Sequence, residues 1–558
     1  MGLKPKKARG AVALAMAAIA LTASAASAEP NDRTWYVRAG ADGDGSRRAP
    51  FGSLAAAEEA SRRGDRIIVR RSSDVLDGGI VLKRGQHLVG RKKPQIADAD
   101  GDAVVLASRT RVRGLRIVAA ARGGIYGENV SRVLIKNNDV SGHNTSCTPG
   151  FHIPPFEVPT TLPDIGIPIG EGLLNGWAGI MVDADRGTRR IAITGNRVHD
   201  AECGDGIDVR AFESARVRAR IAKNDVSDLR QGPNLESVLA IGVQASDGAK
   251  VRAKITRNSE SGLGNDEDAG VGPEGADSEG VFINPVGPSI VRARVNRNTY
   301  THVAGRGGFS ANGLEFVTMG DGARGYVSVR NSEFSETPGD VLEQLALGTN
   351  GTLRLKLANV EATGSTGAAG SGFGNTFIIP GNNGDCLLSA SGGAGNVVTL
   401  DARDVTLTDC ANNGLTFGSS VANGSGPTRR LRMSLEDSTL TGNQGNNLRI
   451  GNVSELDNLK VLVEDSNLSD AEGLASITPA NASFEDLGST TAGAIDLGGG
   501  TLGSAGRNCL DGGILGAALL NYDVTAESNY WGPAVLALPI GGTLDSDPTL
   551  AQPPPHCN

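Results

Sequence analysis

The chain has 558 residues, 78 of them glycine, and aromatic residues make up only 4% of it. This composition excludes a fold built around large aromatic cores and favours thin, repeated layers. The formal net charge of -8 is mildly acidic for this length and argues against a general nucleic-acid binder, so we expect no nucleic-acid partner.

Residues 1–28 are predicted to be a cleaved secretory signal. Basic residues precede the apolar run AVALAMAAIAL, which is too short to cross a bilayer, and ASA at residues 26–28 is typical of a cleavage site. The alternative, a short membrane anchor, lacks a following stop-transfer run. We therefore expect a secreted protein, in the medium, at the cell surface or in the periplasm, with no membrane span after signal removal.

Residues 29–66 are predicted to form an N-terminal segment with one short helix. The stretch SLAAAEEASRR begins at Ser53, a favourable N-cap residue, and ends before Gly64. We expect this helix to cover the open end of the fold that follows, where unpaired strand edges invite aggregation.

Residues 67–535 contain a repeat, which is clearest in VRARIAKNDVSD, VRAKITRNSESG and VRARVNRNTYTH. The β-branched or apolar residue that lies three positions before the Asn recurs along the chain. Its aligned positions are Ile135, Ile193, Ile221, Ile255, Val295, Val329, Leu357, Ala402, Leu435 and Val463. Successive separations from Ile193 to Leu357 are 28, 34, 40, 34 and 28 residues, which indicates a solenoid with insertions.

Each repeat predicts short strands and tight turns. The aligned residue and the residue two positions earlier are apolar and alternate with polar residues, which is the period of a strand. A second strand has the form of AGIMVDA, DGIDVRA or NGLEFVT. Paired helices are excluded because Gly and β-branched residues occupy the positions where good helix formers are needed.

The predicted fold is therefore all-β, a coiled parallel sheet in residues 67–535 with insertions near 143–176 and 262–279. Residues 536–558 are predicted to be a C-terminal tail. Recurrent asparagines at the turns are expected to stack as a hydrogen-bonded ladder. They are Asn138, Asn196, Asn224, Asn258, Asn298 and Asn331.

Three stretches near the N-terminus resemble the opening of secreted right-handed parallel β-helix proteins of the pectin-lyase-like superfamily. They are WYVRAGADGDGSRRAPFGSLAAAEEASRRGDRIIV, GIVLKRGQHLVG and GIYGENVSRVLIKNNDVSG, and ESNYWGPA with GGTLDSDPTL resembles the closing coil. The resemblance covers about residues 34–550. It implies a single-stranded right-handed parallel β-helix with a short N-terminal capping helix, and it leaves the activity open.

Six cysteines are present and no CxxC spacing occurs, so disulfides are favoured over a metal centre in an exported protein. Six cysteines allow 15 pairings. We expect nearest-neighbour pairing, namely Cys147 with Cys203, Cys386 with Cys410, and Cys509 with Cys557.

Basic residues recur three positions before the aligned apolar residue. These positions hold Arg132, Arg190, Arg218, Arg252, Arg292, Tyr326, Arg354, Thr399, Arg432 and Lys460, and a shorter parallel series holds Arg220, Lys254, Arg294 and Lys356. Stacked coils would align these residues, so Arg190, Arg218, Arg252, Arg292 and Arg354 are predicted to bind an extended anionic polysaccharide or cell-surface polymer. The alternative is that Asp and Glu on neighbouring strands neutralise the series.

The densest acidic patch lies in MVDAD and HDAECGDGIDVR. Asp183, Asp205, Asp208 and Arg210 are the catalytic candidates, because paired carboxylates serve acid/base hydrolysis and carboxylates with an arginine serve Ca²⁺-assisted proton abstraction beside a uronate. Related β-helix hydrolases and lyases carry such sets, which implies an alternative function as a polysaccharide lyase, epimerase or hydrolase acting on uronate-containing polymers. DGID matches a fragment of the polygalacturonase pattern, but neither Gly-His-Gly nor Arg-Ile-Lys follows.

The insertion GNDEDAGVGPEGADSEG is the candidate metal site. Asp266, Asp268 and Asp277 offer hard oxygen ligands that suit Ca²⁺, the cofactor that the sequence suggests, although their spacing does not match an EF-hand loop. A solvated acidic loop is the alternative.

Overall fold

The computed structural model describes residues 33–153, 173–230, 232, 237–264, 277–302, 311–365, 384–419, 428–453, 459–472, 480–487, 495–511, 515–520, 524–532, 538–540 and 544–557. The predicted signal, residues 1–28, lies outside these ranges. No helix within them is long and apolar enough to cross a membrane.

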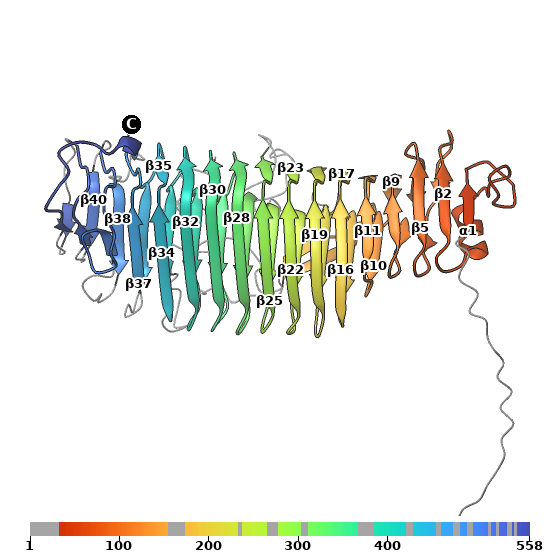
Figure 1. The fold of residues 1–558 in the computed structure, drawn as a ribbon, viewed down its shortest axis with the longest axis horizontal. Helices are drawn as coiled ribbons and strands as arrows, with labels where there is room; N and C mark the ends of the chain where they lie inside the picture. Colours follow the sequence, from red (N-terminus) through yellow and green to blue (C-terminus); the bar gives the residue numbers. More distant parts are fainter. Residues whose placement is uncertain are drawn as a thin grey trace, which may run out of the picture.

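The chain winds through two sheets of parallel strands, which are stacked in one long row (Figure 1). Sheet A comprises β1 (Thr34–Val37), β2 (Arg66–Arg70), β3 (Leu76–Asp77), β5 (His87–Arg91), β6 (Gln95–Asp98), β8 (Arg111–Arg113), β9 (Arg116–Ala120), β11 (Val133–Lys136), β12 (Asp139–Ser141), β16 (Thr188–Thr194), β17 (Arg197–Ala201), β19 (Arg216–Ala222), β20 (Asp225–Leu229), β22 (Lys250–Thr256), β23 (Ser259–Leu263), β25 (Ile290–Asn296), β26 (Thr299–Thr301), β28 (Arg324–Ser335), β30 (Thr352–Thr363), β32 (Val397–Thr408), β34 (Arg430–Glu436), β35 (Thr439–Thr441), β37 (Leu459–Glu464), β39 (Ile495–Gly498), β41 (Val524–Ala526) and β43 (Leu544–Asp545).

Sheet B lies across the core from sheet A. It comprises β4 (Ile80–Val81), β7 (Val104–Val105), β10 (Ile125–Glu128), β14 (Leu173–Gly176), β15 (Ile180–Ala184), β18 (Ile207–Ala211), β21 (Ser237–Ala245), β24 (Asp277–Pro285), β27 (Ala311–Thr318), β29 (Leu342–Ala346), β31 (Leu387–Ser391), β33 (Leu415–Ser419), β36 (Leu448–Val453), β38 (Ala480–Leu487), β40 (Leu515–Leu520) and β42 (Leu538–Ile540). The short strand β13 (Pro149–Ile153) pairs antiparallel with β14.

A typical coil contributes a long strand and a short strand to sheet A and one strand to sheet B, and in β28, β30 and β32 the long and the short strand are continuous. The long strands pair in parallel in the order β11, β16, β19, β22, β25, β28, β30, β32, β34 and β37. The short strands β12, β17, β20, β23 and β26 pair in the same direction. This winding confirms the predicted right-handed parallel β-helix and, at the level of the fold, the resemblance to pectin-lyase-like proteins.

The predicted alternation of side chains is correct. Ile193, Ile221 and Ile255 occupy the same register position on β16, β19 and β22, and all three are fully buried. The residues two positions earlier, such as Ala219 and Ala253, also belong to the core. The intervening residues therefore point outward, in columns that run along the axis of the β-helix.

An asparagine ladder closes the turn between the long and the short strands of sheet A. The side-chain oxygen of Asn196 accepts hydrogen bonds from the backbone N–H and the side-chain amide of Asn138, at 3.0 and 3.1 Å. Asn224, Asn258 and Asn298 continue the same pattern. All five side chains are buried, so the ladder satisfies backbone groups that water cannot reach.

The ladder does not continue through Asn331, contrary to the sequence prediction. The backbone N–H of Asn298 donates instead to the hydroxyl of Ser332, at 3.2 Å. Asn331 is exposed at φ 48°, a left-handed conformation that Asn tolerates, and its side chain bonds to Asn296 and Asn359. The next coil therefore presents a serine, because Ser332 and not Asn331 lies three residues after Val329.

The predicted N-terminal helix forms as α1 (Leu54–Ala60), at one end of the row of strands (Figure 1). The hydroxyl of Ser53 accepts a hydrogen bond from the backbone N–H of Ala56, at 3.2 Å, as an N-cap does. Leu54 and Ala57 are buried, and the helix packs against β1 and β4. Whether the helix acts as a cap stays a prediction.

The three disulfides pair as predicted from the sequence. They join Cys147 to Cys203, Cys386 to Cys410, and Cys509 to Cys557. The first ties the start of the 143–176 insertion to the turn before β18, and the last fixes the C-terminal segment to the final coils. These two bonds therefore hold irregular segments against the regular solenoid, whereas the bond from Cys386 to Cys410 joins the residue before β31 to the turn after β32.

Candidate functional site

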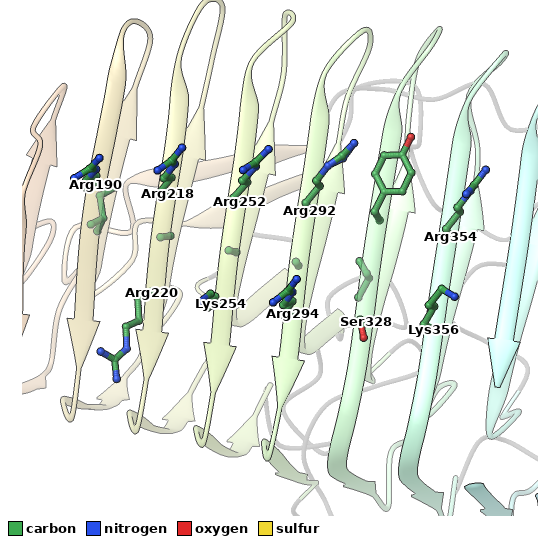
Figure 2. Close-up of a pocket in the computed structure, with 16 residues that line it drawn as sticks. Arg190, Arg218, Arg220, Arg252, Lys254, Arg292, Arg294, Ser328, Arg354 and Lys356 are labelled. Atoms are coloured by element: carbon green, nitrogen blue, oxygen red, sulfur yellow. The ribbon is translucent and has the colours of Figure 1, made fainter. Parts of the chain in front are cut away.

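The long strands of sheet A carry two columns of outward-facing cations. In the first column, Arg190, Arg218, Arg252 and Arg292 pair in successive register positions, followed by Tyr326 and Arg354. The second column contains Arg220, Lys254, Arg294, Ser328 and Lys356. Figure 2 shows the labelled residues as two rows across adjacent strands. The predicted series thus align in one register, with Tyr326 and Ser328 in place of cations on β28.

A groove of about 840 Å³ lies between the two columns (Figure 2). Its floor is formed by residues that lie between the columns and turn inward, including Ala219, Ala253 and Ala293. Successive outward residues of one strand are about 7 Å apart at the backbone, so the two columns run parallel along the axis with the groove between them. All five predicted substrate-binding arginines line this groove.

Acidic residues do not neutralise the groove within the part of the chain that the structure describes. Among those residues, Lys356 forms an ion pair with Asp401 at 2.8 Å, but none of the five arginines has an acidic partner. The guanidinium of Arg292 lies 4.2 Å from the centre of the Tyr326 ring. The predicted alternative, neutralisation by Asp and Glu, therefore applies to Lys356 and not to the five arginines.

The basic surface extends beyond the residues that the sequence singled out. Arg84, Arg109 and Arg132 line a pocket of about 440 Å³ on the preceding coils. Beyond Arg354, a groove of about 320 Å³ includes Arg430, Arg432 and Lys460. The sequence did not single out Arg84 and Arg109, because the repeat was aligned only from Ile135. The parallel pairing of β5 with β8 and of β8 with β11 places Arg109 beside Arg132. Arg430 belongs to a third outward position on its strand.

Asp183 and Arg210, two of the catalytic candidates, form a buried ion pair on the outer face of sheet B. Nε and Nη2 of Arg210 donate to the two carboxylate oxygens of Asp183 at 2.8 and 2.7 Å, and Nη1 donates to the backbone oxygen of Gly150. The two residues share a register position on β15 and β18. This pair holds the β13 segment against sheet B, and it leaves neither charge free.

Asp205 and Asp208, the other candidates, form a fully buried carboxyl pair next to that ion pair. Asp205 accepts a hydrogen bond from the backbone N–H of Leu239 at 2.8 Å. The remaining oxygen of Asp205 and both oxygens of Asp208 accept no well-formed hydrogen bond from the described residues, although the backbone N–H of Gly242 lies near Asp208, so a proton shared between the two carboxyls satisfies them best.

Burial raises the pKa of Asp208 to about 7, an effect that Arg210 opposes and Asp183 reinforces. Burial and the charge of Asp208 raise the pKa of Asp205 well above its ordinary value. Both groups therefore hold protons at mildly acidic pH that exposed aspartates have lost.

We expect the stability of the protein to fall as the pH rises from about 4 through about 7, because native Asp208 keeps a proton that the unfolded chain releases. In Asp208→Asn, the loss of unfolding free energy between low and high pH should be smaller, by about 1.4 kcal/mol for each pKa unit by which folding raises the pKa of Asp208. Denaturant midpoints at pH 5 and pH 8 measure the effect, with exposed Asp42→Asn as the control. An unchanged pH dependence in Asp208→Asn would contradict the shared proton.

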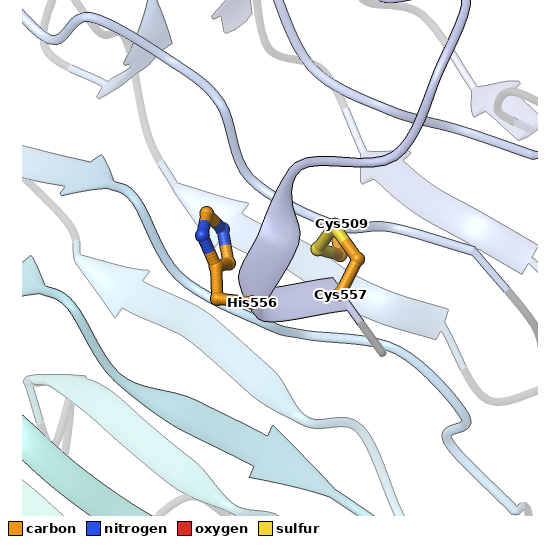
Figure 3. A group of neighbouring side chains, drawn as sticks. All are labelled: Cys509, His556 and Cys557. Atoms are coloured by element: carbon orange, nitrogen blue, oxygen red, sulfur yellow. A yellow bond between two sulfur atoms is a disulfide. The ribbon is translucent and has the colours of Figure 1, made fainter.

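The predicted metal ligands Asp266 and Asp268 lie outside the described residues, and only the backbone of Asp277, at the start of β24, is described. The Ca²⁺ site therefore stays a prediction. A different group, Cys509, His556 and Cys557, brings possible metal ligands together. Figure 3 shows that its two sulfur atoms form the C-terminal disulfide, so they are not thiolate ligands.

No protein-family model matches the sequence, and no curated protein is significantly similar to it. Among solved structures, the A-module of a mannuronan C-5 epimerase from Azotobacter vinelandii is similar over 74% of this chain and 93% of its own, with 11% identity and a TM-score of 0.41. The catalytic domain of a GH87 α-1,3-glucanase in complex with nigerose is similar over 83% and 70%, with 11% identity and a TM-score of 0.37.

The Dettilon tailspike protein is similar over 68% of this chain and 63% of its own, with 11% identity and a TM-score of 0.34. None of these likenesses is close enough to assign a substrate or a mechanism. The function of the candidate sites is therefore inferred from their own residues and geometry.

Proposed function

We propose that this protein binds an extended anionic polysaccharide or cell-surface polymer in the groove of sheet A. The observation that carries the proposal is the pair of exposed cation columns whose five arginines have no acidic partner among the described residues. Like charges in adjacent coils repel one another, so the arrangement is unfavourable until an anion occupies it. A bound polyanion would relieve this repulsion along the whole column.

Because the columns run along the axis of the β-helix, they suit a long, linear ligand. Adjacent strands lie about 4.8 Å apart, so the basic positions from Arg84 to Lys460 span about 50 Å along the axis. A polysaccharide with one acidic group on each sugar presents its charges at a comparable interval. Such a polymer would meet one or two cations in most coils while it runs perpendicular to the strands.

Secretion is part of the proposal. The described part of the chain contains three disulfides, and such bonds persist in oxidising compartments outside the cytoplasm. An anionic polymer of the cell surface or the medium is the ligand class that an exported protein would meet. A membrane partner is not required by this arrangement.

Catalysis at Asp183, Asp205, Asp208 and Arg210 is the second candidate function, as a lyase, epimerase or hydrolase. The raised pKa of Asp208, about 7, favours it because a general acid or base works best near its own pKa. Both carboxyls of the pair are fully buried, however, and they lie on β18 of sheet B and in the turn before it, whereas the cation columns lie on sheet A. Binding is therefore the better-supported function.

The experiment is a retention screen of residues 29–558 on immobilised polysaccharides. Polygalacturonate and alginate are compared with neutral dextran, with Ca²⁺ and with a chelator, and released unsaturated or reducing ends are measured. We expect salt-sensitive retention on the anionic polymers without product. Product that disappears in Asp208→Asn would establish the enzyme instead, and equal retention on dextran would overturn anion binding.

A further inference from the structure

Within the 840 Å³ groove, the cation columns are interrupted at one coil. On β28, Tyr326 occupies the first column between Arg292 and Arg354, and Ser328 occupies the second column between Arg294 and Lys356. Both side chains line the groove and are half-buried. One coil of the groove is therefore neutral, although the coils on both sides carry two cations each.

Tyr326 is held in place by its neighbour. The guanidinium of Arg292 lies 4.2 Å from the centre of the ring, which is within the range of a cation–π contact. This contact fixes the ring in the wall of the groove while Arg292 stays exposed to solvent. The neutral coil thus offers a positioned aromatic surface and, two residues further along the same strand, the Ser328 hydroxyl.

A ligand recognised by charge alone would gain nothing from this coil. An arginine at position 326 would complete the column, and a polyphosphate-like chain would bind it more tightly. A sugar ring differs because its C–H faces pack on an aromatic ring and its hydroxyls hydrogen-bond with Ser. The neutral coil therefore suits a polyanion whose backbone consists of sugar rings.

We infer that Tyr326 and Ser328 form a ring-binding subsite, which makes the groove specific for carbohydrate polyanions over polyanions without sugar rings. Tyr326 packs on one face of a sugar, Ser328 bonds to one of its hydroxyls, and the flanking cations bind the acidic groups of the neighbouring sugars. This inference rests on the proposed binding function and names the chemical class of its ligand.

Polygalacturonate and inorganic polyphosphate of matched charge are the two probes of the inference. The dissociation constants of wild type and Tyr326→Ala are measured at the same ionic strength. We expect Tyr326→Ala to weaken polygalacturonate binding by about three- to tenfold, the range for one aromatic contact, and to leave polyphosphate binding unchanged. Tyr326→Phe should retain polygalacturonate binding, and Tyr326→Arg should strengthen polyphosphate binding while it weakens polygalacturonate binding.

Two outcomes would overturn the inference: an equal effect of Tyr326→Ala on both probes, or no effect on polygalacturonate. Arg252→Glu, measured beside it, separates these outcomes from a failure of the proposed function. If Arg252→Glu weakens the binding of both probes while Tyr326→Ala does not discriminate between them, the groove binds anions and only the ring subsite is wrong. If neither variant changes binding, the groove is not the binding surface.

Discussion

Reversing two charges at the centre of the groove, with Arg252→Glu and Arg292→Glu together, is expected to weaken retention by an anionic polysaccharide by about 10²- to 10⁴-fold. Each arginine would donate charge-assisted hydrogen bonds to an acidic group, worth about 1.5–3 kcal/mol, and each glutamate adds repulsion. The two positions pair directly on β22 and β25, so the change removes cations from adjacent coils. Dissociation constants at two salt concentrations measure the loss.

The matched control is Arg47→Glu with Arg48→Glu, which makes the same change in net charge at exposed positions before α1. This control should bind nearly as well as the wild type, and both double variants should keep the thermal midpoint, because all four side chains are exposed. Equal weakening by the control would show that binding follows net charge. Full binding by Arg252→Glu with Arg292→Glu would exclude the groove.

Replacing Glu260 by leucine is expected to raise the free energy of unfolding by about 2 kcal/mol at pH 8, the cost of a buried polar group without a partner. Glu260 points into the core between Val226 and Tyr300, which occupy the same register position on the adjacent coils. It is 1% exposed, and neither carboxyl oxygen has a hydrogen-bond partner among the described residues. Leucine fills similar space without a polar atom.

Burial, reinforced by the charge of Asp225, raises the pKa of Glu260 well above its ordinary value of 4.5. Native Glu260 keeps a proton that the unfolded chain releases, so its contribution to stability is fully present below about pH 4.5 and is lost as the pH rises toward the raised pKa. Urea denaturation at pH 4.5 and pH 8 measures this. Glu260→Leu should lose the pH-dependent part, and so should Glu260→Gln, although Gln leaves its amide unpartnered and gains less stability. A pH dependence that survives both substitutions would contradict this assignment.

The sequence predicted the fold and the cation columns because both follow from one property, the two-residue period of a strand. Once Ile221, Ile255 and Val295 were aligned as inward residues, the outward direction of Arg218, Arg252 and Arg292 followed. The nearest-neighbour disulfides, which the sequence analysis expected without a structural argument, are consistent with a solenoid, in which contacts are made mainly between successive coils.

Features that depend on local insertions were not predictable. The register places Asp183 and Asp208 on the outer face of sheet B, but nothing in the sequence spacing showed that Arg210 would form an ion pair with Asp183 or that both Asp205 and Asp208 would be buried. The shift from Asn331 to Ser332 was missed because the asparagine was matched by residue type and not by its distance from Val329. The sequence RNSESG contains Glu260, but its burial without a hydrogen-bond partner could not be predicted, because it depends on Val226 and Tyr300 of the neighbouring coils.

Because each coil contacts mainly the coils before and after it, the number of coils determines the length of polymer that the groove can bind. Because the long strands from β16 to β30 share one register, a coil duplicated between β19 and β22 would add one pair of cations and about 4.8 Å of groove. The asparagine ladder would accept it, since each rung bonds only to the rung before and after it. The gain or loss of whole repeats would therefore lengthen or shorten the groove, and with it the stretch of polymer bound, while the contacts within the other coils stay the same.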